Sequence, residues 1–521
     1  MKEQQRYNKI EAYLLNVIVV LLPFLVVGFI LFLNGYKLRF SMLLPAWNDE
    51  VGWWNQVNTM IQYGEPFGYY GYNGTHAVIG KWAAWGGTPL LPYFLFGKIF
   101  GWNLYSMALA NMTFLSISLF IFLILTKPDK KQKVWLIGTY ICLTIAIGYS
   151  MTSMSEGLRY SLGIILTALL IWLEQKSQKK NQKFSGKDFF ITIIIVIIIY
   201  YAITVYLIFS LVVPLFCWFF FRKKKFLLRA GISFIITGLT TVSANHFVSL
   251  TSSPYTTSTI HQIIQTIKDK GWYHGICYVL DLFFNNLATV DFPNLLNGDT
   301  ILFWFFSFYL LFLCYLMVVL LRLLKNIDKT DCFTGNKNYY ILALWVTAGF
   351  LFGYCMLYTG SRWTLCRGIN TGLIMALLFL IFVENRIDKK GFILISLLSI
   401  VSIWGYYSQI VDERASIAQY TDTILAEKKQ MEEVIEISKD NSVWENTVAH
   451  YGTVNFMYLT LPAGCGLNYM IAGKENKNAK YALITVDDKN QETYKQMLLD
   501  TGHNIIYEDK FFIVLLNPNF K

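Results

Sequence analysis

The sequence predicts an all-α polytopic membrane domain of about eleven transmembrane helices, followed by a small extracytoplasmic α/β domain. Of the 521 residues, 55% are hydrophobic and only 15% are charged. Soluble proteins carry about 25% charged residues, so a soluble globule of this composition would have too little polar surface. Apolar runs long enough to cross a bilayer recur through residues 1–409, and a charged composition returns from residue 410 onward.

The candidate spans are apolar runs of roughly 20 residues, the length that a helix needs to cross the hydrocarbon core. They are 13–33, 104–126, 134–150, 157–173, 189–221, 230–249, 301–321, 339–358, 368–384 and 391–409. The run 189–221 is too long for one untilted span and has basic residues at both ends. We therefore predict two short helices there, with a turn near Tyr200–Thr204. The first run lacks a small-residue cleavage site and is expected to be an anchor.

The basic residues predict the orientation. With the N-terminus inside, the short inner segments hold 24 of the 44 Lys and Arg residues, and the longer outer loops are nearly neutral. This asymmetry follows the positive-inside rule and predicts an N-in, C-out topology in the cell membrane. It also accounts for the net charge of +11 without a nucleic-acid partner.

The chain is expected to form two domains. Residues 1–409 form the membrane domain, with a long first outer loop at 34–103 and a second long loop at 250–300 that contains a helix near Ile260–Lys268. Residues 410–521 form the extracytoplasmic domain. Apolar residues at helical spacing predict an amphipathic helix over 412–438, and Gln491–Leu499 is a second helix. Tyr481–Val486 and Phe511–Leu516 have the composition of strands.

An enzyme that works on the outer face needs a general base from the outer loops. The membrane domain has eight carboxylates there, namely Asp49, Glu50, Glu65, Glu156, Asp269, Asp281, Asp291 and Asp299. Asp49 and Glu50 are adjacent and lie among tryptophans. Desolvation and mutual repulsion favour a role as base for one of them. Alternatively, Asn48 or Asp49 caps a helix over Val51–Gln62; both interpretations can hold together.

Five further residues are candidates for the site. Glu156 opens the fourth span and lies one helical turn before Arg159, so the two form either a local ion pair or a functional pair at the membrane boundary. Arg362 and Arg367 lie at the outer mouth of a span, where guanidinium groups suit either a substrate phosphate or ordinary anionic headgroups. His76, in a glycine-rich outer loop, is either a substrate-orienting residue or a structural histidine.

The sequence assigns no metal site. The eight cysteines are scattered and form no C-x-x-C pair, so neither structural zinc nor thiol-redox chemistry is expected. No P-loop or Ser-His-Asp arrangement is evident.

The architecture resembles the GT-C superfamily of integral-membrane glycosyltransferases, in particular its bacterial cell-surface-polysaccharide members. Its local motifs here are Trp47-Asn48-Asp49-Glu50, Tyr69-Tyr70-Gly71-Tyr72-Asn73-Gly74 and Trp85-Gly86-Gly87-Thr88-Pro89. Protein O-mannosyltransferases, the lipid A aminoarabinose transferase and oligosaccharyltransferases are members of this superfamily. They use polyprenyl-phosphate-linked sugars.

The resemblance implies a role for each candidate. Asp49 matches the catalytic base, with Glu50 as its neighbour, and Glu156 matches the second acidic residue of several members. Arg362 or Arg367 would hold the donor phosphate. The implied reaction is an inverting transfer, at the outer face of the cytoplasmic membrane, of a hexose or pentose to a hydroxyl of a glycan, lipid or protein. A divalent metal, Mg or Mn, remains open as a cofactor, and the lipid tail is expected in a groove beside 189–221.

Two other functions remain alternatives. A polysaccharide polymerase or ligase would rely on arginines rather than on a carboxylate pair. A lipid or oligosaccharide transporter would place charges within its spans near the midplane, whereas here the carboxylates gather at one face.

Overall fold

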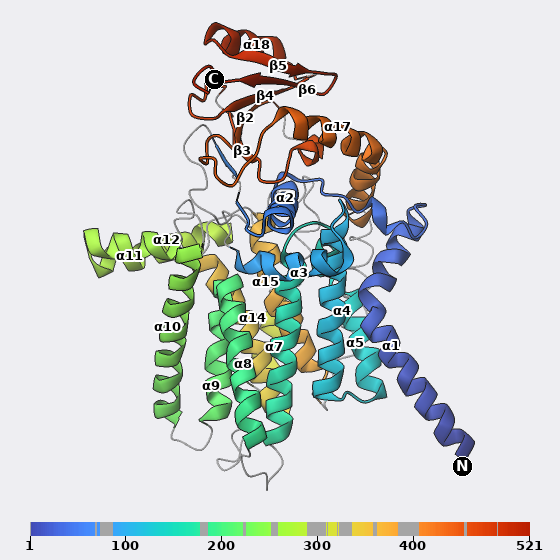
Figure 1. Ribbon diagram of the computed structural model, residues 1–521. Coiled ribbons are helices and arrows are strands. Elements are labelled where there is room, and N and C mark those ends of the chain that lie inside the picture. Colours follow the sequence, from blue (N-terminus) through green and yellow to red (C-terminus); the bar gives the residue numbers. More distant parts are fainter. Residues whose placement is uncertain are drawn as a thin grey trace.

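The computed structural model, shown in Figure 1, describes residues 2–67, 70–72, 87–177, 186–221, 226–251, 259–288, 309, 311–319, 321, 336–357, 362–383, 406–452, 456–471, 473–486 and 488–520. A bundle of long helices forms the lower part of the molecule, a layer of short helices lies across one end of the bundle, and a sheet-containing domain stands on that layer (Figure 1). The N-terminus lies at the opposite end of the bundle from the sheet.

The bundle contains the apolar helices that the sequence predicts. They are α1 (Lys2–Leu33), α4 (Ser106–Thr126), α7 (Glu156–Ser177), α10 (Phe226–Thr251), α14 (Asn336–Leu357) and α15 (Arg362–Leu380). Among the described residues, five helices are long and apolar enough to cross a membrane, and one bent helix pair would make a sixth. In the expected span 301–321, residues 309, 311–319 and 321 are described and are helical, whereas only 406–409 of the expected span 391–409 are described. The total of eleven spans and the orientation therefore stay predictions.

Two of the expected spans are broken helices. The run 134–150 forms α5 (Lys130–Ile141) and α6 (Thr144–Ser150), which meet at an angle of 70°. The run 189–221 forms α8 (Gly186–Val205), the 3-10 helix η3 (Leu207–Val212) and α9 (Val213–Phe220). The break lies at Tyr206, beyond the expected Tyr200–Thr204, because the isoleucine-rich helix continues through that segment. The next helix begins at Val213, and Pro214 lies in its first turn, where the missing N–H leaves no helical hydrogen bond unmade.

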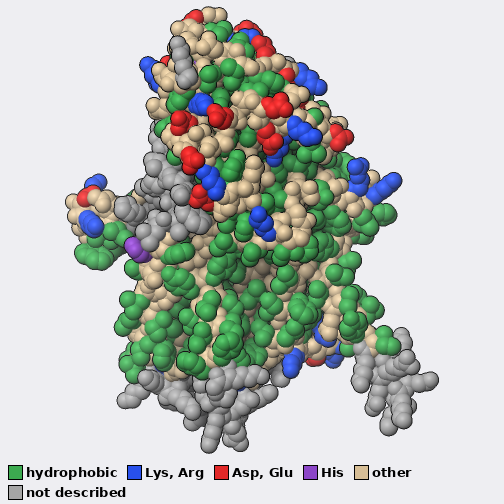
Figure 2. All heavy atoms as spheres, viewed as in Figure 1, with side chains coloured by type: hydrophobic (Ala, Val, Ile, Leu, Met, Phe, Trp, Pro, Cys, Tyr) green, Lys and Arg blue, Asp and Glu red, His purple; other side chains and the backbone are tan. Residues whose placement is uncertain are grey.

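Close packing at the centre of the bundle depends on small residues. A Cβ atom at Gly157 of α7 would lie 2.5 Å from the side chain of Asn111 on α4, so only glycine allows this approach. The outward faces are apolar instead. Phe29, Ile197 and Leu239 are each at least 60% exposed, and hydrophobic side chains cover the bundle in Figure 2, as expected for a surface in contact with lipid.

Short helices form the layer at the end of the bundle nearest the sheet, which is called the outer end after the topology that the sequence predicts. They are η1 (Phe40–Met42), α2 (Asn48–Tyr63), η2 (Thr88–Leu90), α3 (Leu91–Phe100), α11 (Thr259–Lys270) and α12 (Trp272–Ala288). The helix expected near Ile260–Lys268 is confirmed as α11. Together with α12, it projects sideways from the end of α10 (Figure 1).

The expected amphipathic helix 412–438 is two helices, one over residues 406–418 and α17 over Thr421–Val434. The helix after them is α18 (Gln491–Asp500). The strands are β2 (Thr447–Tyr451), β3 (Gly466–Tyr469), β4 (Tyr481–Thr485), β5 (Asn504–Glu508) and β6 (Phe512–Leu516), with η5 (Phe456–Thr460) between β2 and β3. The predicted strands and the second helix of this domain are confirmed.

The sheet has the order β1-β3-β2-β4-β6-β5. The first four strands are parallel, and β6 is antiparallel to both β4 and β5. The edge strand β1 (Tyr70–Tyr72) comes from the first outer loop, where Tyr70 pairs with Leu467 of β3. An apolar cluster also joins Val51 and Trp54 of α2 to Ile417 and Ile424. The outer loop and the C-terminal domain therefore form one packed unit above the bundle.

Candidate functional site

The segment between α6 and α7 is the centre of the candidate site. Asn111 of α4 donates from its Nδ2 atom to the carbonyl oxygens of Thr152, at 2.9 Å, and Met154, at 2.7 Å. The Oδ1 atom of Asn111 accepts from the hydroxyl of Tyr93, at 2.6 Å. Residues 151–155 are buried. A single buried amide side chain thus fixes the segment that leads into Glu156.

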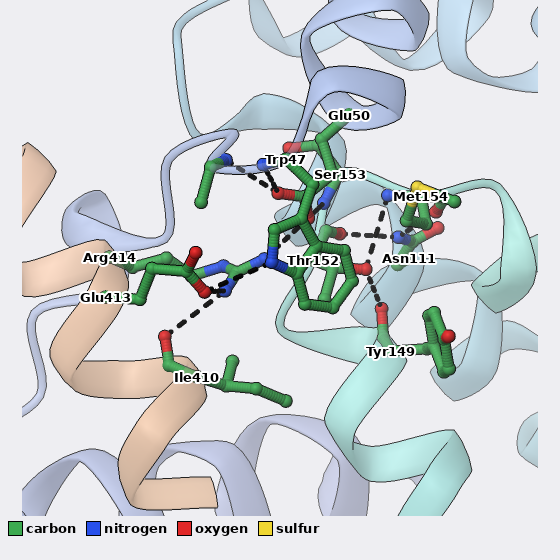
Figure 3. Close-up of polar contacts among 11 residues, drawn as sticks. Trp47, Glu50, Asn111, Tyr149, Thr152, Ser153, Met154, Ile410, Glu413 and Arg414 are labelled. Carbon is green, nitrogen blue, oxygen red and sulfur yellow. Dashed lines mark hydrogen bonds and ion pairs between the residues drawn. The ribbon is translucent and has the colours of Figure 1, made fainter. Parts of the chain in front are cut away.

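Glu50 is buried and accepts hydrogen bonds from four groups (Figure 3). Its Oε2 atom accepts from the backbone N–H groups of Ala46, at 2.6 Å, and Trp47, at 2.9 Å. Its Oε1 atom accepts from the backbone N–H of Ser153, at 2.8 Å, and from Nη2 of Arg414, at 2.6 Å. The carboxylate therefore caps the start of α2 and joins it to the 151–155 segment.

Asp49 lies beside Glu50 in the first turn of α2 and is half-buried. Helix α2 begins at Asn48, with Trp47 as its N-cap residue, so Asn48 and Asp49 lie inside the first turn and neither occupies the N-cap position that the sequence suggested. Successive side chains leave a helix about 100° apart, because one turn takes 3.6 residues. Asp49 therefore points in a different direction from the clamped Glu50, while the negative charge of both suits the helix N-terminus.

Glu156, Arg159 and Arg367 come together at the outer end of the bundle. Oε1 of Glu156 is 3.6 Å from Nη2 of Arg159 and 3.4 Å from Nε of Arg367. Glu156 and Arg159 are buried, and the side chain of Arg367 is 18% exposed. The other carboxylate oxygen of Glu156 is buried and has no hydrogen-bond partner among the described residues. Two cations face one anion here, so the cluster has an excess positive charge.

Tyr206, which the sequence analysis did not single out, completes this cluster. Its ring centroid lies 3.9 Å from Cζ of Arg159. Its hydroxyl donates to the carbonyl oxygen of Ser155, at 3.0 Å, and is 2.6 Å from the Ser155 hydroxyl. The signal in the sequence was an overlong apolar run that had to break, but only the structure places the break at Tyr206.

The structure does not place the remaining candidate residues in this cluster. His76 lies in 73–86, outside the described residues. Arg362 is the first residue of α15, but its side chain is not among those described. Asp269 lies on the exposed face of α11, where it accepts from Gln265 at 3.1 Å.

An apolar groove with a cavity volume of about 410 Å³ lies between η2, α3, α8 and α10. It is lined by Gly87, Thr88, Leu91, Val196, Ile197, Tyr200, Tyr201, Thr204 and Phe247. The hydroxyl of Tyr201 donates to the carbonyl oxygen of Thr88, at 3.1 Å, and so joins two of its walls. Thr204 lies two residues before Tyr206, so the groove runs close to the arginine cluster.

The described residues contain no group of three or more His, Cys, Asp or Glu side chains that would hold a metal ion. Carboxylates and substrate phosphate oxygens can bind Mg²⁺ together with few protein ligands. Among the described residues, the protein ligands for a metal ion would therefore be single carboxylates. Whether the protein uses Mg²⁺ or Mn²⁺ stays open.

No protein-family model and no curated protein sequence matches the chain. Among solved structures, ArnT from Cupriavidus metallidurans bound to undecaprenyl phosphate is similar in fold, with a TM-score of 0.48, 10% identity, and coverage of 96% of this chain and 97% of ArnT. The apo state of that protein gives a TM-score of 0.45, 10% identity, and coverage of 92% and 95%. The apo oligosaccharyltransferase of Archaeoglobus fulgidus gives 0.49 and 11% identity, covering 97% of this chain and 75% of the other. At these identities the likeness concerns the fold alone.

Proposed function

We propose that the protein is a GT-C-type glycosyltransferase that moves a sugar from a polyprenyl-phosphate donor to an acceptor hydroxyl at the outer face of the cell membrane. One observation carries the proposal. An apolar groove of about 410 Å³ runs close to a buried cluster of two arginines and one glutamate. This combination suits a ligand that has a long hydrocarbon tail and a phosphate head.

The arginine cluster is the proposed site of the donor phosphate. Guanidinium groups bind phosphate through charge-assisted hydrogen bonds, which are stronger where water is excluded. Glu156 neutralises part of the charge of Arg159 and Arg367, which lowers the free-energy cost of burying the two arginines. The cluster still keeps one net positive charge for the ligand. Its unpartnered oxygen is then available to a donor or acceptor hydroxyl.

Asp49 is the proposed general base. The acceptor oxygen attacks the anomeric carbon as its proton passes to Asp49, and the bond between that carbon and the lipid phosphate oxygen breaks. The polyprenyl phosphate leaves with an added negative charge, which Arg159 and Arg367 stabilise. The 151–156 segment supports this division of roles, because it contacts Glu50 through Ser153 and Tyr206 through Ser155.

The direct test offers the purified full chain in lipid nanodiscs a panel of polyprenyl-phosphate sugars and acceptor glycans or lipids. Loss of a positioned base costs about 10²–10⁴-fold in rate, so we expect Asp49→Asn to lower kcat by that order. The matched control is Asp269→Asn, an exposed carboxylate of the outer layer. Full activity of a folded Asp49→Asn variant would show that the base is another residue.

Two arginine variants test the donor site in the same assay. Arg159→Gln and Arg367→Gln are each expected to raise the KM for the donor about tenfold, the equivalent of about 1.4 kcal/mol. Lys98→Gln removes a cation of the outer layer that lies near the Ile61 carbonyl, and is the control. Unchanged donor KM in both arginine variants would contradict the phosphate role, and sugar that crosses liposomes without any transfer would favour a transporter.

A further inference from the structure

Arg414 is a fully buried cation that comes from outside the membrane domain. It lies on the helix 406–418, which leads into the C-terminal domain, and its side chain is 0% exposed. Nη2 donates to Glu50 at 2.6 Å, and Nη1 donates to the carbonyl oxygen of Ile410 at 3.2 Å. The guanidinium carbon lies 5.0 Å from the ring centroid of Trp47. Figure 3 shows this side chain extending from its helix toward Glu50.

The contacts of Glu50 join three segments that are far apart in the sequence. Ala46 and Trp47 precede α2, Ser153 belongs to the 151–155 segment, and Arg414 belongs to the helix 406–418. Asp49 is the neighbour of Glu50, and Glu156 follows Ser153 by three residues. The Glu50 carboxylate thus connects the two segments that carry the acidic residues to which the proposed function assigns roles.

Glu50 itself is unsuited to accept a substrate proton. Each of its oxygens already accepts two hydrogen bonds, so neither oxygen is open to a substrate hydroxyl. Burying a carboxylate is costly unless it is paired, and Arg414 supplies the opposite charge. In a variant without that cation, Glu50 keeps its three backbone N–H donors, and its uncompensated charge disfavours a second negative charge on the adjacent Asp49.

We propose that Glu50 and Arg414 are a pair of positioning residues that holds Asp49 and the Glu156 segment in register and keeps Asp49 ionised. The C-terminal helix thereby supplies a residue on which the rate of transfer depends. This inference rests on the proposed function of Asp49. It assigns Glu50 a different role from the second acid of a catalytic pair.

The decisive experiment measures kcat, donor KM and the pH–rate profile of the full chain in nanodiscs for Arg414→Gln, Arg414→Lys and the double variant Glu50→Gln/Arg414→Gln. We expect Arg414→Gln to lower kcat at least tenfold, to change donor KM less than twofold, and to move the acid limb of the profile to higher pH. Arg414→Lys keeps the charge and should recover part of kcat. The double variant removes both charges, so its acid limb should return to the wild-type position.

The position of the acid limb in the pH–rate profile separates a positioning role from a purely structural one. If Glu50 and Arg414 only stabilised the fold, the acid limb would not move in Arg414→Gln and return in Glu50→Gln/Arg414→Gln. Among the described residues, the charged groups near the pair include Glu413 on the same helix and the cluster of Glu156, Arg159 and Arg367, and all of these are retained in every variant. Lys480→Gln, which breaks the ion pair with Glu436 elsewhere in the C-terminal domain, is the matched control.

The two proposals fail in different ways. A wild-type chain without transfer activity, or an active Asp49→Asn variant, overturns the proposed function. Wild-type kcat and an unmoved acid limb in Arg414→Gln, with Asp49→Asn inactive, overturn the positioning role. Hydrogen exchange of residues 151–155 gives a readout that needs no activity: Arg414→Gln should lose protection there, and unchanged protection contradicts the inference.

Discussion

Glu50 and Glu156 are both buried carboxylates at the outer end of the bundle, but their surroundings suit different tasks. Both oxygens of Glu50 are occupied by four donors. Glu156 places one oxygen between two guanidinium groups and leaves the other without a hydrogen-bond partner among the described residues. An unsatisfied buried acceptor is costly unless a ligand completes it. We infer that Glu156 meets the substrates, whereas Glu50 supports the residues that do.

His450 gives a second prediction at the residue scale, which concerns stability. It lies in β2 of the C-terminal domain, is 1% exposed, and has its Nε2 atom 3.0 Å from the Thr485 hydroxyl. Burial disfavours the charged imidazolium and lowers the pKa of His450 from 6.5 to about 3. Above pH 6.5 both folded and unfolded chains hold it neutral. As the pH falls below 6.5, only the unfolded chain binds the proton, so stability decreases toward pH 3.

The predicted loss of stability at pH 5, relative to pH 8, is about 2 kcal/mol, because each pH unit between the two pKa values contributes about 1.4 kcal/mol. His450→Phe removes the titrating group and should flatten this part of the pH dependence, as measured by hydrogen exchange of β2. His274→Phe, at an exposed position on α12, is the control and should keep the wild-type slope. Equal slopes in His450→Phe and wild type would contradict the prediction.

The residue scale is also where the sequence predicts least. Asp49 and Glu50 are adjacent, and Glu156 and Arg159 are one helical turn apart, so local spacing made both pairs visible before the structure. The pair of Glu50 with Arg414 spans 364 positions, and that of Glu156 with Arg367 joins two helices. Neither contact follows from composition or periodicity, because both depend on how separate helices pack.

At the element scale, the break after α8 determines the layout of the proposed site. It places Tyr206 and the apolar groove at the same level of the bundle. A chain that bends at Tyr206 lets the ring lie against Arg159, while the preceding turns of α8 line the apolar groove. A continuous helix over 189–221 would carry the next residues along the bundle axis, away from this cluster. The break thus links the proposed tail site to the proposed phosphate site.

Filling the groove should therefore affect long donors selectively. Val196 lines the groove from α8, and Val196→Trp places an indole in it. We expect the KM for a donor with an undecaprenyl chain to rise about tenfold, the equivalent of about 1.4 kcal/mol, whereas a donor with a two-isoprene chain changes less. The measurement compares KM for both donors. Val242→Trp, on α10 at a position that is 69% exposed, is the control, and an equal effect of both variants would contradict a tail site here.

Most elements could be predicted because apolar length and periodicity are local properties. The spans at 104–126, 157–173 and 339–358 correspond closely to α4, α7 and α14. The helix expected over 412–438 was wrong as one element, since the chain turns at 419–420. Gln419 and Tyr420 are not helix breakers, so no local signal marks that turn. It arises because residues on both sides pack against α2 and the sheet.

At the scale of the whole molecule, the C-terminal domain is built into the outer loops. The first outer loop supplies strand β1, and α2 contacts the turn before β3. Asn55 donates to the carbonyl oxygen of Cys465 at 3.4 Å, and the backbone N–H of Gly464 donates to the Thr59 hydroxyl at 2.7 Å. The sequence predicts two separate domains at residue 410, and could not reveal this shared sheet, because β1 is only three residues long.

Gly464 is the position at which this docking can be tested. Its φ of +84° favours glycine, and a Cβ atom there would lie 2.5 Å from the Phe67 ring and 2.9 Å from Ile437. Gly464→Val should therefore push the turn away from α2 and loosen the contact that keeps Arg414 and β1 in place. We expect faster hydrogen exchange in α2 and β1 and at least a tenfold lower rate of sugar transfer, because the helix that carries the proposed base, Asp49, loses its support. Gly502→Ala introduces the same type of backbone strain, at a φ of +90°, but lies at the far side of the domain with contacts no closer than 3.6 Å. If both variants slow transfer equally while exchange in α2 stays as in the wild type, the docking of the C-terminal domain does not control the site.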